Sequence, residues 1–415
     1  AGRCRENVAF AASGHAVAAV AGACVAATSL VRRRRGPLFL FGRLAASRRP
    51  VLRGGRGLAP HGRAAAGLSD VMGLSSSVEE LPPCTAANGE LFLYNEDFGF
   101  AAFEVAGAAG GRRSGRALVC IGGLTDGLLS LRYLPLLAGA VSQGGWRVVQ
   151  PVLSSSYRGW GTGSLDEDAE EIDRLLECLA SQRGVSEVAL LGHSTGCQDV
   201  VRYLKVGKRV SMVRAALLQA PVSDREALSL TSSSSGEDFD AALHKYRQMA
   251  TSMIAEGKGE EVMPRAASLL LGPPHAVTAY RFNSLTGRMT DDDMFSSDLT
   301  DVELRQKLGH ITIPTLLAVS LDDEYVPEFV DSQALASRMC TAMAAGSLGL
   351  AEIFPIEEGG HGLRLATAQR KFVDGVCAFL ESVDKTGRPC LSWEAATAKD
   401  IEQKAAAAAA AAAAA

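Results

Sequence analysis

The chain of 415 residues is long enough for one large domain or two ordinary ones, and its 47% apolar residues can fill a sizeable core. Its net charge of −4 is unevenly distributed, because residues 1–69 hold twelve Arg and a single acid and carry +11, which leaves −15 for the remainder. An acidic body argues against nucleic acid as a partner, since binding phosphates needs a basic surface. Nine scattered cysteines without a C-x-x-C pair indicate reduced thiols rather than a disulfide framework or a zinc site.

The first 69 residues have the composition of a targeting region rather than of a folded domain. Residues 8–31 are mostly apolar, end at Arg32–Arg35 and are long enough to span a membrane. The stretch that follows is rich in Arg, Ala and Gly and nearly free of acids, as organelle transit peptides are. We therefore expect an organelle location, a plastid in preference to a mitochondrion. The alternatives are an unstructured extension and a membrane anchor at residues 8–31 that is retained.

From about residue 88 the pattern predicts strands that alternate with helices. A hairpin over residues 90–107 comes first. Buried strands are expected at 116–124, 146–153, 187–191, 214–223 and within 313–327, where the strand itself covers 313–319, and residues 351–362 hold the last strand and its loop. Helices are expected at 130–145, 164–182, 197–204 and 367–383. Ser164 is the expected N-cap of the second helix, which has an acidic first turn. This alternation predicts one α/β domain over 88–383, with a mostly parallel sheet covered by helices on both faces.

Two segments depart from the alternation. Residues 224–310 contain a run of serines and several helical pieces between two predicted strands. An insertion at this place predicts a lid whose shape would decide the substrate. Residues 384–415 form a C-terminal tail that ends in eleven alanines, to which the sequence assigns no function.

The stretch Gly192-His193-Ser194-Thr195-Gly196 matches G-x-S-x-G between a predicted strand and a predicted helix. A strand that turns abruptly into a helix holds a serine hydroxyl above the sheet, with the helix N-terminus behind it. The glycines leave room for neighbouring chain at this strained turn. Ser194 is therefore the candidate nucleophile, whereas the neighbouring His193 is expected to pack.

A nucleophilic serine needs a base and an acid that orients the base, and both follow Ser194 in the order Ser, Asp, His. The strand that begins near residue 313 runs into Asp322, Asp323 and Glu324. We prefer Asp323, with Asp322 second and Glu324 third, because an acid two residues before Val-Pro is the usual form of this loop. His361, between glycines after the last predicted strand, is the candidate base.

The oxyanion donors are expected at two places. One is the backbone N–H of Thr195, and the other is that of Gly123 or Leu124 in the glycine-rich turn after the strand 116–122. Asp126 in the same turn is expected to cap the next helix rather than to lie near the substrate.

Three consecutive aspartates, Asp291–Asp293, raise the question of a metal site, because carboxylates suit hard cations. Consecutive side chains rarely point to one ion, so we expect these acids to cap a helix or to pair with Arg281 and Arg288. The sequence predicts no metal and no cofactor.

The motifs GGLTDGL, GHSTGCQDVVRYL, AYRFNSL, DDDMFSSDL, DEYVP and GGHG together resemble the α/β-hydrolases of fungi and plants that include the fungal siderophore (fusarinine) esterase. The resemblance covers about residues 88–383. It implies the α/β-hydrolase fold, a triad of Ser194, Asp323 and His361, and hydrolysis of a carboxylic ester in a small molecule. It does not carry the siderophore itself over to this chain.

We therefore expect a serine hydrolase that works through an acyl-serine intermediate. Thioester and amide substrates remain open, because they use the same triad. The alternatives from other classes are a protein of the same fold that binds a ligand without turnover, and a scaffold subunit of a membrane complex. The sequence does not determine the oligomeric state.

Overall fold

A computed structural model of the chain describes residues 85–107, 114–235, 237–272 and 275–388. The predicted targeting region, residues 1–69, and the tail from residue 389 lie outside the described residues. Among the helices of the described part, none combines the length and the apolar character needed to cross a membrane.

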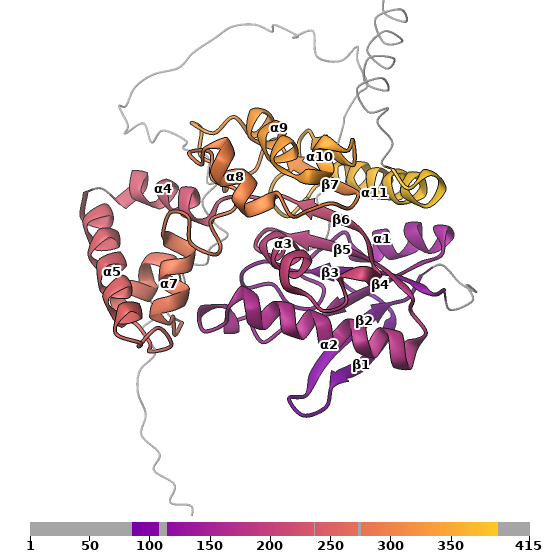
Figure 1. Ribbon diagram of the computed structural model, residues 1–415, viewed down its shortest axis with the longest axis horizontal. Helices are drawn as coiled ribbons and strands as arrows, with labels where there is room; N and C mark the ends of the chain where they lie inside the picture. Colours follow the sequence, from indigo (N-terminus) through magenta and orange to yellow (C-terminus); the bar gives the residue numbers. More distant parts are fainter. Residues whose placement is uncertain (1–84, 108–113, 236, 273–274, 389–415) are drawn as a thin grey trace, which may run out of the picture. The chain divides into compact units, whose positions relative to one another are not determined.

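Eight strands form one sheet in the order β1-β2-β4-β3-β5-β6-β7-β8 (Figure 1). The hairpin strand β2 pairs antiparallel with both β1 and β4, and every other neighbouring pair is parallel. The strands are β1 (Gly89–Asn95), β2 (Phe100–Val105), β3 (Arg116–Ile121), β4 (Trp146–Pro151), β5 (Glu187–His193), β6 (Val213–Gln219), β7 (Thr315–Ser320) and β8 (Ala351–Ile356). The predicted α/β class and the mostly parallel sheet are confirmed.

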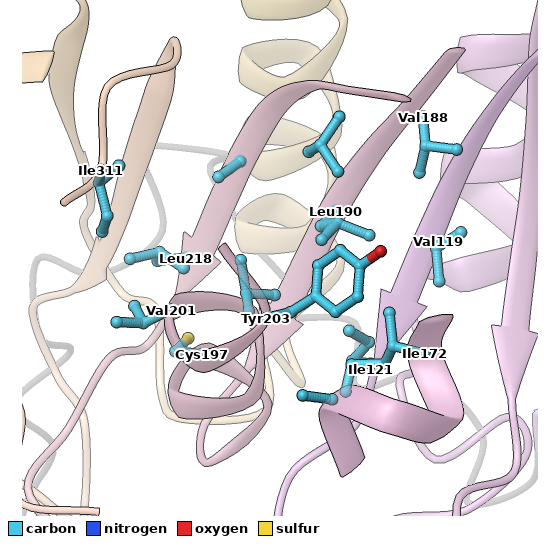
Figure 2. Packing of buried hydrophobic residues seen from close by; sticks show 14 of the residues in the cluster. Val119, Ile121, Ile172, Val188, Leu190, Cys197, Val201, Tyr203, Leu218 and Ile311 are labelled. Carbon is cyan, nitrogen blue, oxygen red and sulfur yellow. The ribbon is translucent and has the colours of Figure 1, made fainter. Parts of the chain in front are cut away.

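Helices cover both faces of the sheet, as alternate side chains of the strands require. On one face, Leu118 of β3 packs in a cluster with helices α1 (Leu134–Val141) and α11 (Ala366–Thr386). On the other face, Val119 packs in a cluster with helices α2 (Leu165–Arg183) and α3 (Gly196–Val206). Figure 2 shows this second cluster, in which Tyr203 and Val201 of α3 lie over the strand residues Leu190 and Leu218.

The N-terminus of α2 follows the sequence prediction. The side chain of Ser164 accepts the N–H of Glu167 at 3.2 Å, and three acids lie in the first turn. This cap satisfies one of the free donors of the first turn, and the acids complement the positive end of the helix dipole. Helix α2 thereby has a fixed start directly after the loop that follows β4.

The segment between β6 and β7 supplies helices rather than strands. It contains α4 (Asp224–Ser235), α5 (Glu237–Ala255), α6 (Arg265–Ser268), α7 (Ala279–Thr286) and α8 (Asp301–Leu308). Phe282 of α7 and Leu243 of α5 belong to a separate apolar cluster that also includes Trp160 from the loop before α2. The predicted insertion 224–310 therefore has a small core of its own.

The ends of two predicted strands, β6 and β7, position the candidate site. The strand expected over 214–223 ends at Gln219, because the backbone of Ala220 turns into the left-handed region with φ 52°. The strand expected over 313–319 is present as β7 and ends at Ser320, and the chain beyond it forms the loop that carries Asp323. Both ends lie at the carboxyl edge of the parallel strands, where ligands bind in open α/β sheets.

Candidate active site

Ser194 lies at the turn between β5 and α3 and has φ 55°. This left-handed conformation is costly for a residue with a side chain, and such strain gathers at functional sites. The two flanking glycines permit the turn by close approach. A Cβ on Gly192 would lie 2.3 Å from the carbonyl oxygen of Gly196, and one on Gly196 would lie 2.4 Å from that of Ile121. A larger residue at Gly192 would open the turn itself, and one at Gly196 would push the turn away from β3.

Three side chains from the ends of three different strands meet at this turn. Nε2 of His361 lies 2.8 Å from Oγ of Ser194. Nδ1 of the same ring lies 2.8 Å from Oδ2 and 3.0 Å from Oδ1 of Asp323. The structure thus brings Ser194, His361 and Asp323 into one hydrogen-bonded chain, the arrangement in which a serine can be activated by a histidine that a carboxylate orients.

The three candidate acids of the β7 loop have different surroundings. Asp323 is buried and points at His361, whereas Asp322 is exposed. Oε2 of Glu324 accepts the backbone N–H of His361 at 2.8 Å, so this side chain holds the loop of the histidine rather than its ring. The ring of Tyr325 packs edge-on against His361 with centroids 4.6 Å apart.

The electrostatics of His361 suit a base. Burial alone would lower the pKa of His361, but the charge and the hydrogen bond of Asp323 outweigh it and hold this pKa above the usual histidine value of 6.5. The imidazolium form is therefore stabilised relative to a solvated histidine, which favours transfer of a proton from the serine hydroxyl.

The turn after β3 lies against the serine and contains the candidate oxyanion donors. The N–H of Gly123 is already bonded to Oδ2 of Asp126 at 2.8 Å. By contrast, the N–H groups of Leu124 and Thr195 donate to no other protein group within the described ranges. Of the two donors considered for this turn, Leu124 is the one with a free N–H.

The prediction that Asp126 caps the next helix is wrong. Helix α1 begins after Tyr133 without a side-chain cap, and a proline stands in its first turn. The carboxylate of Asp126 instead closes its own turn onto Gly123, and it lies 3.7 Å from Nε2 of His193. A short turn places the carboxylate nearer to its own backbone than to a helix that starts eight residues later.

Gln219 was not among the residues that the sequence singled out. Its side chain is fully buried at the end of β6, next to the nucleophile strand, and contacts both His193 and the loop of His361. A polar residue at the carboxyl end of a strand expected to be buried is the signal that could have revealed it.

The acidic run Asp291–Asp293 does not converge on one point. Asp292 pairs with Arg281 at 2.7 Å, Asp291 accepts from the hydroxyl of Tyr280 at 2.5 Å, and Asp293 accepts the backbone N–H of Met289 at 2.6 Å. The expected pairing with Arg281 is present. Arg288 instead pairs with Asp298 and Glu303, outside the run.

Among the described residues, no group of three or more His, Cys, Asp or Glu side chains has the arrangement that holds a metal ion. All the cysteines of the described part are free thiols. One of them, Cys197, lies in the first turn of α3 behind Ser194, and burial raises the pKa of its thiol well above the usual value. This thiol is therefore poorly suited to act as a nucleophile.

Two hollows flank the Ser194–His361–Asp323 chain. One lies beside Asp323 and is lined largely by apolar side chains, among them Phe295 and Leu335. The other is lined by Leu124 and Thr195 together with the charged residues Asp168, Asp199 and Arg281. A substrate carbonyl at the serine would thus have one apolar and one polar neighbourhood.

Comparison with known proteins places this geometry in a family. Residues 81–381 match the family described as "Protein of unknown function (DUF1749)". Esterase AN6793 of Emericella nidulans is 32% identical over 310 residues, which cover 62% of this chain and 81% of that protein. Fusarinine C esterase sidJ of Aspergillus fumigatus is 33% identical over 268 residues, covering 54% of this chain and 76% of the relative.

A solved structure shares the architecture. The siderophore hydrolase EstB of Aspergillus fumigatus superposes with a TM-score of 0.60 at 28% identity, over 72% of this chain and 99% of that one. The eight-stranded sheet, with a serine turn after β5 and helices on both faces, is an α/β-hydrolase fold. The family match spans both the sheet and the insertion, and the chain therefore belongs to the DUF1749 family of α/β-hydrolase-fold proteins.

Proposed function

We propose that this protein is a serine hydrolase that cleaves a carboxylic ester of a small molecule through an acyl-Ser194 intermediate. The observation that carries the proposal is the chain of hydrogen bonds from Ser194 through His361 to Asp323, with the serine held at φ 55°. The names of relatives, which include esterases, support the ester as the bond that is broken.

In the first half-reaction, Oγ of Ser194 attacks the ester carbonyl while Nε2 of His361 takes the hydroxyl proton. The carboxylate of Asp323 holds the ring with Nδ1–H toward itself and stabilises the imidazolium. The N–H groups of Leu124 and Thr195 bind the developing oxyanion. His361 then gives its proton to the leaving alcohol, and the acyl group remains on the serine.

In the second half-reaction, a water molecule takes the place of the alcohol. His361 removes a proton from this water as it attacks the acyl carbonyl, and the same backbone N–H groups bind the oxyanion again. Collapse of the tetrahedral intermediate returns the proton from His361 to Ser194 and releases the carboxylic acid. The two half-reactions together consume the ester and one water molecule, and the proton transfers are made by His361.

The insertion 224–310 is proposed as the lid over this site. Its helix α4 begins at Asp224, its Phe295 lines the hollow at Asp323, and its Arg281 lines the hollow at Leu124 and Thr195. Residues that border both hollows set the size and polarity of what fits there. The fusarinine C and siderophore substrates in the names of the relatives belong to those proteins.

Labelling of the full chain with a fluorophosphonate probe tests the proposal, with Ser194→Ala as the matched variant. We expect the wild type to label on Ser194, located by mass spectrometry, and to hydrolyse p-nitrophenyl esters, whereas the variant does neither. The preferred acyl length then begins to define the lid. A folded wild type that neither labels nor turns over would instead favour a ligand-binding or scaffold protein of this fold.

We further propose that residues 1–69 direct the protein to an organelle, a plastid in preference to a mitochondrion. The twelve arginines and the near absence of acids support this proposal. Fusion of residues 1–69 to a fluorescent protein, with a fusion of 32–69 alone, tests it. Plastid fluorescence and cleavage of the leader are expected. Retention of residues 8–31 in a membrane fraction would favour the anchor instead.

A further inference from the structure

Gln219 ends β6, the strand that neighbours the nucleophile strand β5 in Figure 1. The residue has 0% exposure, and its backbone carbonyl and both polar atoms of its side chain contact residues of the candidate active site. Its backbone carbonyl accepts the N–H of Ser194 at 3.0 Å. Its side chain joins His193 at 2.5 Å through Oε1 and the backbone carbonyl of His361 at 3.1 Å through Nε2.

These contacts fix the orientation of the amide and the tautomer of His193. The carbonyl of His361 can only accept, so the amide nitrogen of Gln219 must face it and the amide oxygen must face His193. His193 therefore donates from Nδ1. Burial, reinforced by the neighbouring His361, holds the pKa of His193 below its usual value, so its Nε2 carries no proton at neutral pH.

The ring of His193 also lies close to His361 and to the oxyanion turn. Its ring lies 4.9 Å from the ring of His361, measured between centroids. Its Nε2 lies 3.7 Å from Oδ2 of Asp126, the atom that accepts the N–H of Gly123 at 2.8 Å. The charged or titratable groups that face His193 are thus His361, Asp126 and Asp323.

We infer that Gln219 is a positioning residue that locks the loop of His361 to the serine turn, and that it acts through its side-chain amide. The inference rests on the proposed function, because the loop it holds carries the proposed base. Ser194 and His361 are far apart in the sequence and come from different strand ends. The backbone carbonyl of Gln219 holds Ser194 and its side-chain amide holds the loop of His361, so the amide sets how close Nε2 of His361 comes to Oγ of Ser194.

The free-energy cost of burying the Gln219 amide supports a role beyond packing. A buried amide loses its hydrogen bonds to water, so both its oxygen and its nitrogen need partners within the protein. An apolar residue of similar shape would not have this requirement. The strand also ends directly afterwards at Ala220, whose φ of 52° is strained for a residue with a side chain. The turn at Ala220 ends the strand immediately after the side chain that reaches the two loops.

Two substitutions separate positioning from packing. Gln219→Met keeps the length of the side chain but neither accepts from His193 nor donates to His361. Gln219→Glu keeps the shape and accepts from His193, but donates to His361 only when its own carboxyl is protonated. The matched control is Gln369→Met, because Gln369 is equally buried and donates to the carbonyl of Leu363 at 2.7 Å, in the same loop but away from Ser194 and His193.

The measurement is the rate of fluorophosphonate labelling of Ser194 between about pH 5.5 and 8.5, with kcat and KM on p-nitrophenyl acetate and the Tm of each variant. Gln219→Met should lose about tenfold to a hundredfold in labelling rate and kcat, with KM within about twofold. For Gln219→Glu, the labelling rate relative to wild type should rise about fivefold as the pH falls, because the new carboxyl then binds a proton and can donate to His361. Gln369→Met should lower the Tm while its labelling rate stays within about twofold of wild type.

The inference would be overturned if Gln219→Met and Gln369→Met lost labelling rate and kcat equally. It would also be overturned if the labelling rate of Gln219→Glu relative to wild type did not change with pH. If wild-type Ser194 does not label, the proposed function fails separately. Histidine ring spectra by NMR then decide the inference, since the pKa of His361 should differ between wild type and Gln219→Met. An unchanged pKa and unchanged ring shifts would overturn it.

Discussion

Gly123 lies directly against Ser194, so that a Cβ at Gly123 would be 2.6 Å from the Cβ of the serine and 3.1 Å from its Oγ. Ser194 and Gly123 cannot move apart, because Gln219 accepts the backbone N–H of the serine and Asp126 accepts that of the glycine. The close approach brings the turn that carries the free N–H of Leu124 next to the nucleophile.

Gly123→Ala should therefore separate the proposed oxyanion donors from the serine. We expect kcat/KM on p-nitrophenyl esters to fall about a hundredfold, the usual cost of losing one oxyanion donor. Gly139→Ala is the matched control, because a Cβ at Gly139 meets nothing within 4 Å and its helical position gains about 0.5–1 kcal/mol of stability from alanine. Activity of Gly123→Ala equal to that of the control would contradict the assignment of this turn.

Asp323→Asn tests the acid of the proposed triad through pH dependence. Neutral His361 is the base, and Asp323 holds the pKa of His361 above 6.5, so wild-type activity should rise with pH through a midpoint above that value. Removing the charge should shift this midpoint to lower pH and lower kcat by about 10³-fold or more, because the ring is no longer held in the working tautomer.

Asp322→Asn is the control for this experiment, since the Asp322 side chain is exposed and lies in the same loop. Its pH profile and its kcat should match wild type. A shifted midpoint in Asp322→Asn and none in Asp323→Asn would reverse the choice between the two acids.

The strands, the helices and the serine turn follow from sequence because each has a local signature. The run at 187–191 is apolar, Ser194 stands between glycines, and helix α2 has a cap and an apolar face that repeat at helical spacing. Strand ends are less well determined. The expected strand 214–223 stops at Gln219 because the backbone turns at Ala220, and an alanine in the sequence does not predict such a turn.

Local sequence patterns do not predict the contacts between the ends of different strands. The direction in which each of two consecutive aspartates points depends on the backbone of the loop, so Asp322 and Asp323 differ only once β7 and β8 are paired. The predicted role of Asp126 was wrong for the same reason, because an acidic residue in a turn can bond either to its own turn or to the next helix. Gln219 acquires its partners only when β5, β6 and the loop of His361 come together.

A buried acid pair predicts how stability depends on pH. Asp168 and Asp199 share a side-chain hydrogen bond, and burial, with a further contribution from Glu171, raises the pKa of Asp168 to about 7. The folded state therefore binds protons more tightly than the unfolded chain, and this pair's contribution to stability should fall as the pH rises from about 4 to about 7.

Asp168→Asn should remove much of that dependence, because an amide keeps the hydrogen bond to Asp199 and carries no charge. The Tm of the variant relative to wild type should rise between about pH 5 and pH 8, since each unit of raised pKa corresponds to about 1.4 kcal/mol. Asp166→Asn should instead lower the Tm by an amount that stays constant over this range, because Arg202 lowers the pKa of Asp166 and the wild-type carboxylate is ionised throughout it. A Tm difference for Asp168→Asn that does not vary with pH would rule out the raised pKa.

Arg281 joins the insertion to the sheet domain through buried charge. Its Nη1 lies 2.7 Å from Asp292, its Nε donates to the carbonyl of Trp160 at 3.0 Å, and it is 3% exposed. Arg281→Met would leave Asp292, Asp168 and Asp199 without their cation. We expect the free energy of unfolding in denaturant to fall by about 3–5 kcal/mol, the usual cost of removing one partner of a buried pair.

The double variant Arg281→Met/Asp292→Leu separates this charge effect from lost packing. Removing both partners takes away the uncompensated carboxylate, so the double variant should be more stable than Arg281→Met alone. Arg288→Met is the surface control, because its pair with Glu303 lies in solvent and its loss should leave the Tm nearly unchanged. If the double variant is no more stable than Arg281→Met, packing of the arginine stem rather than its charge holds the insertion to the sheet.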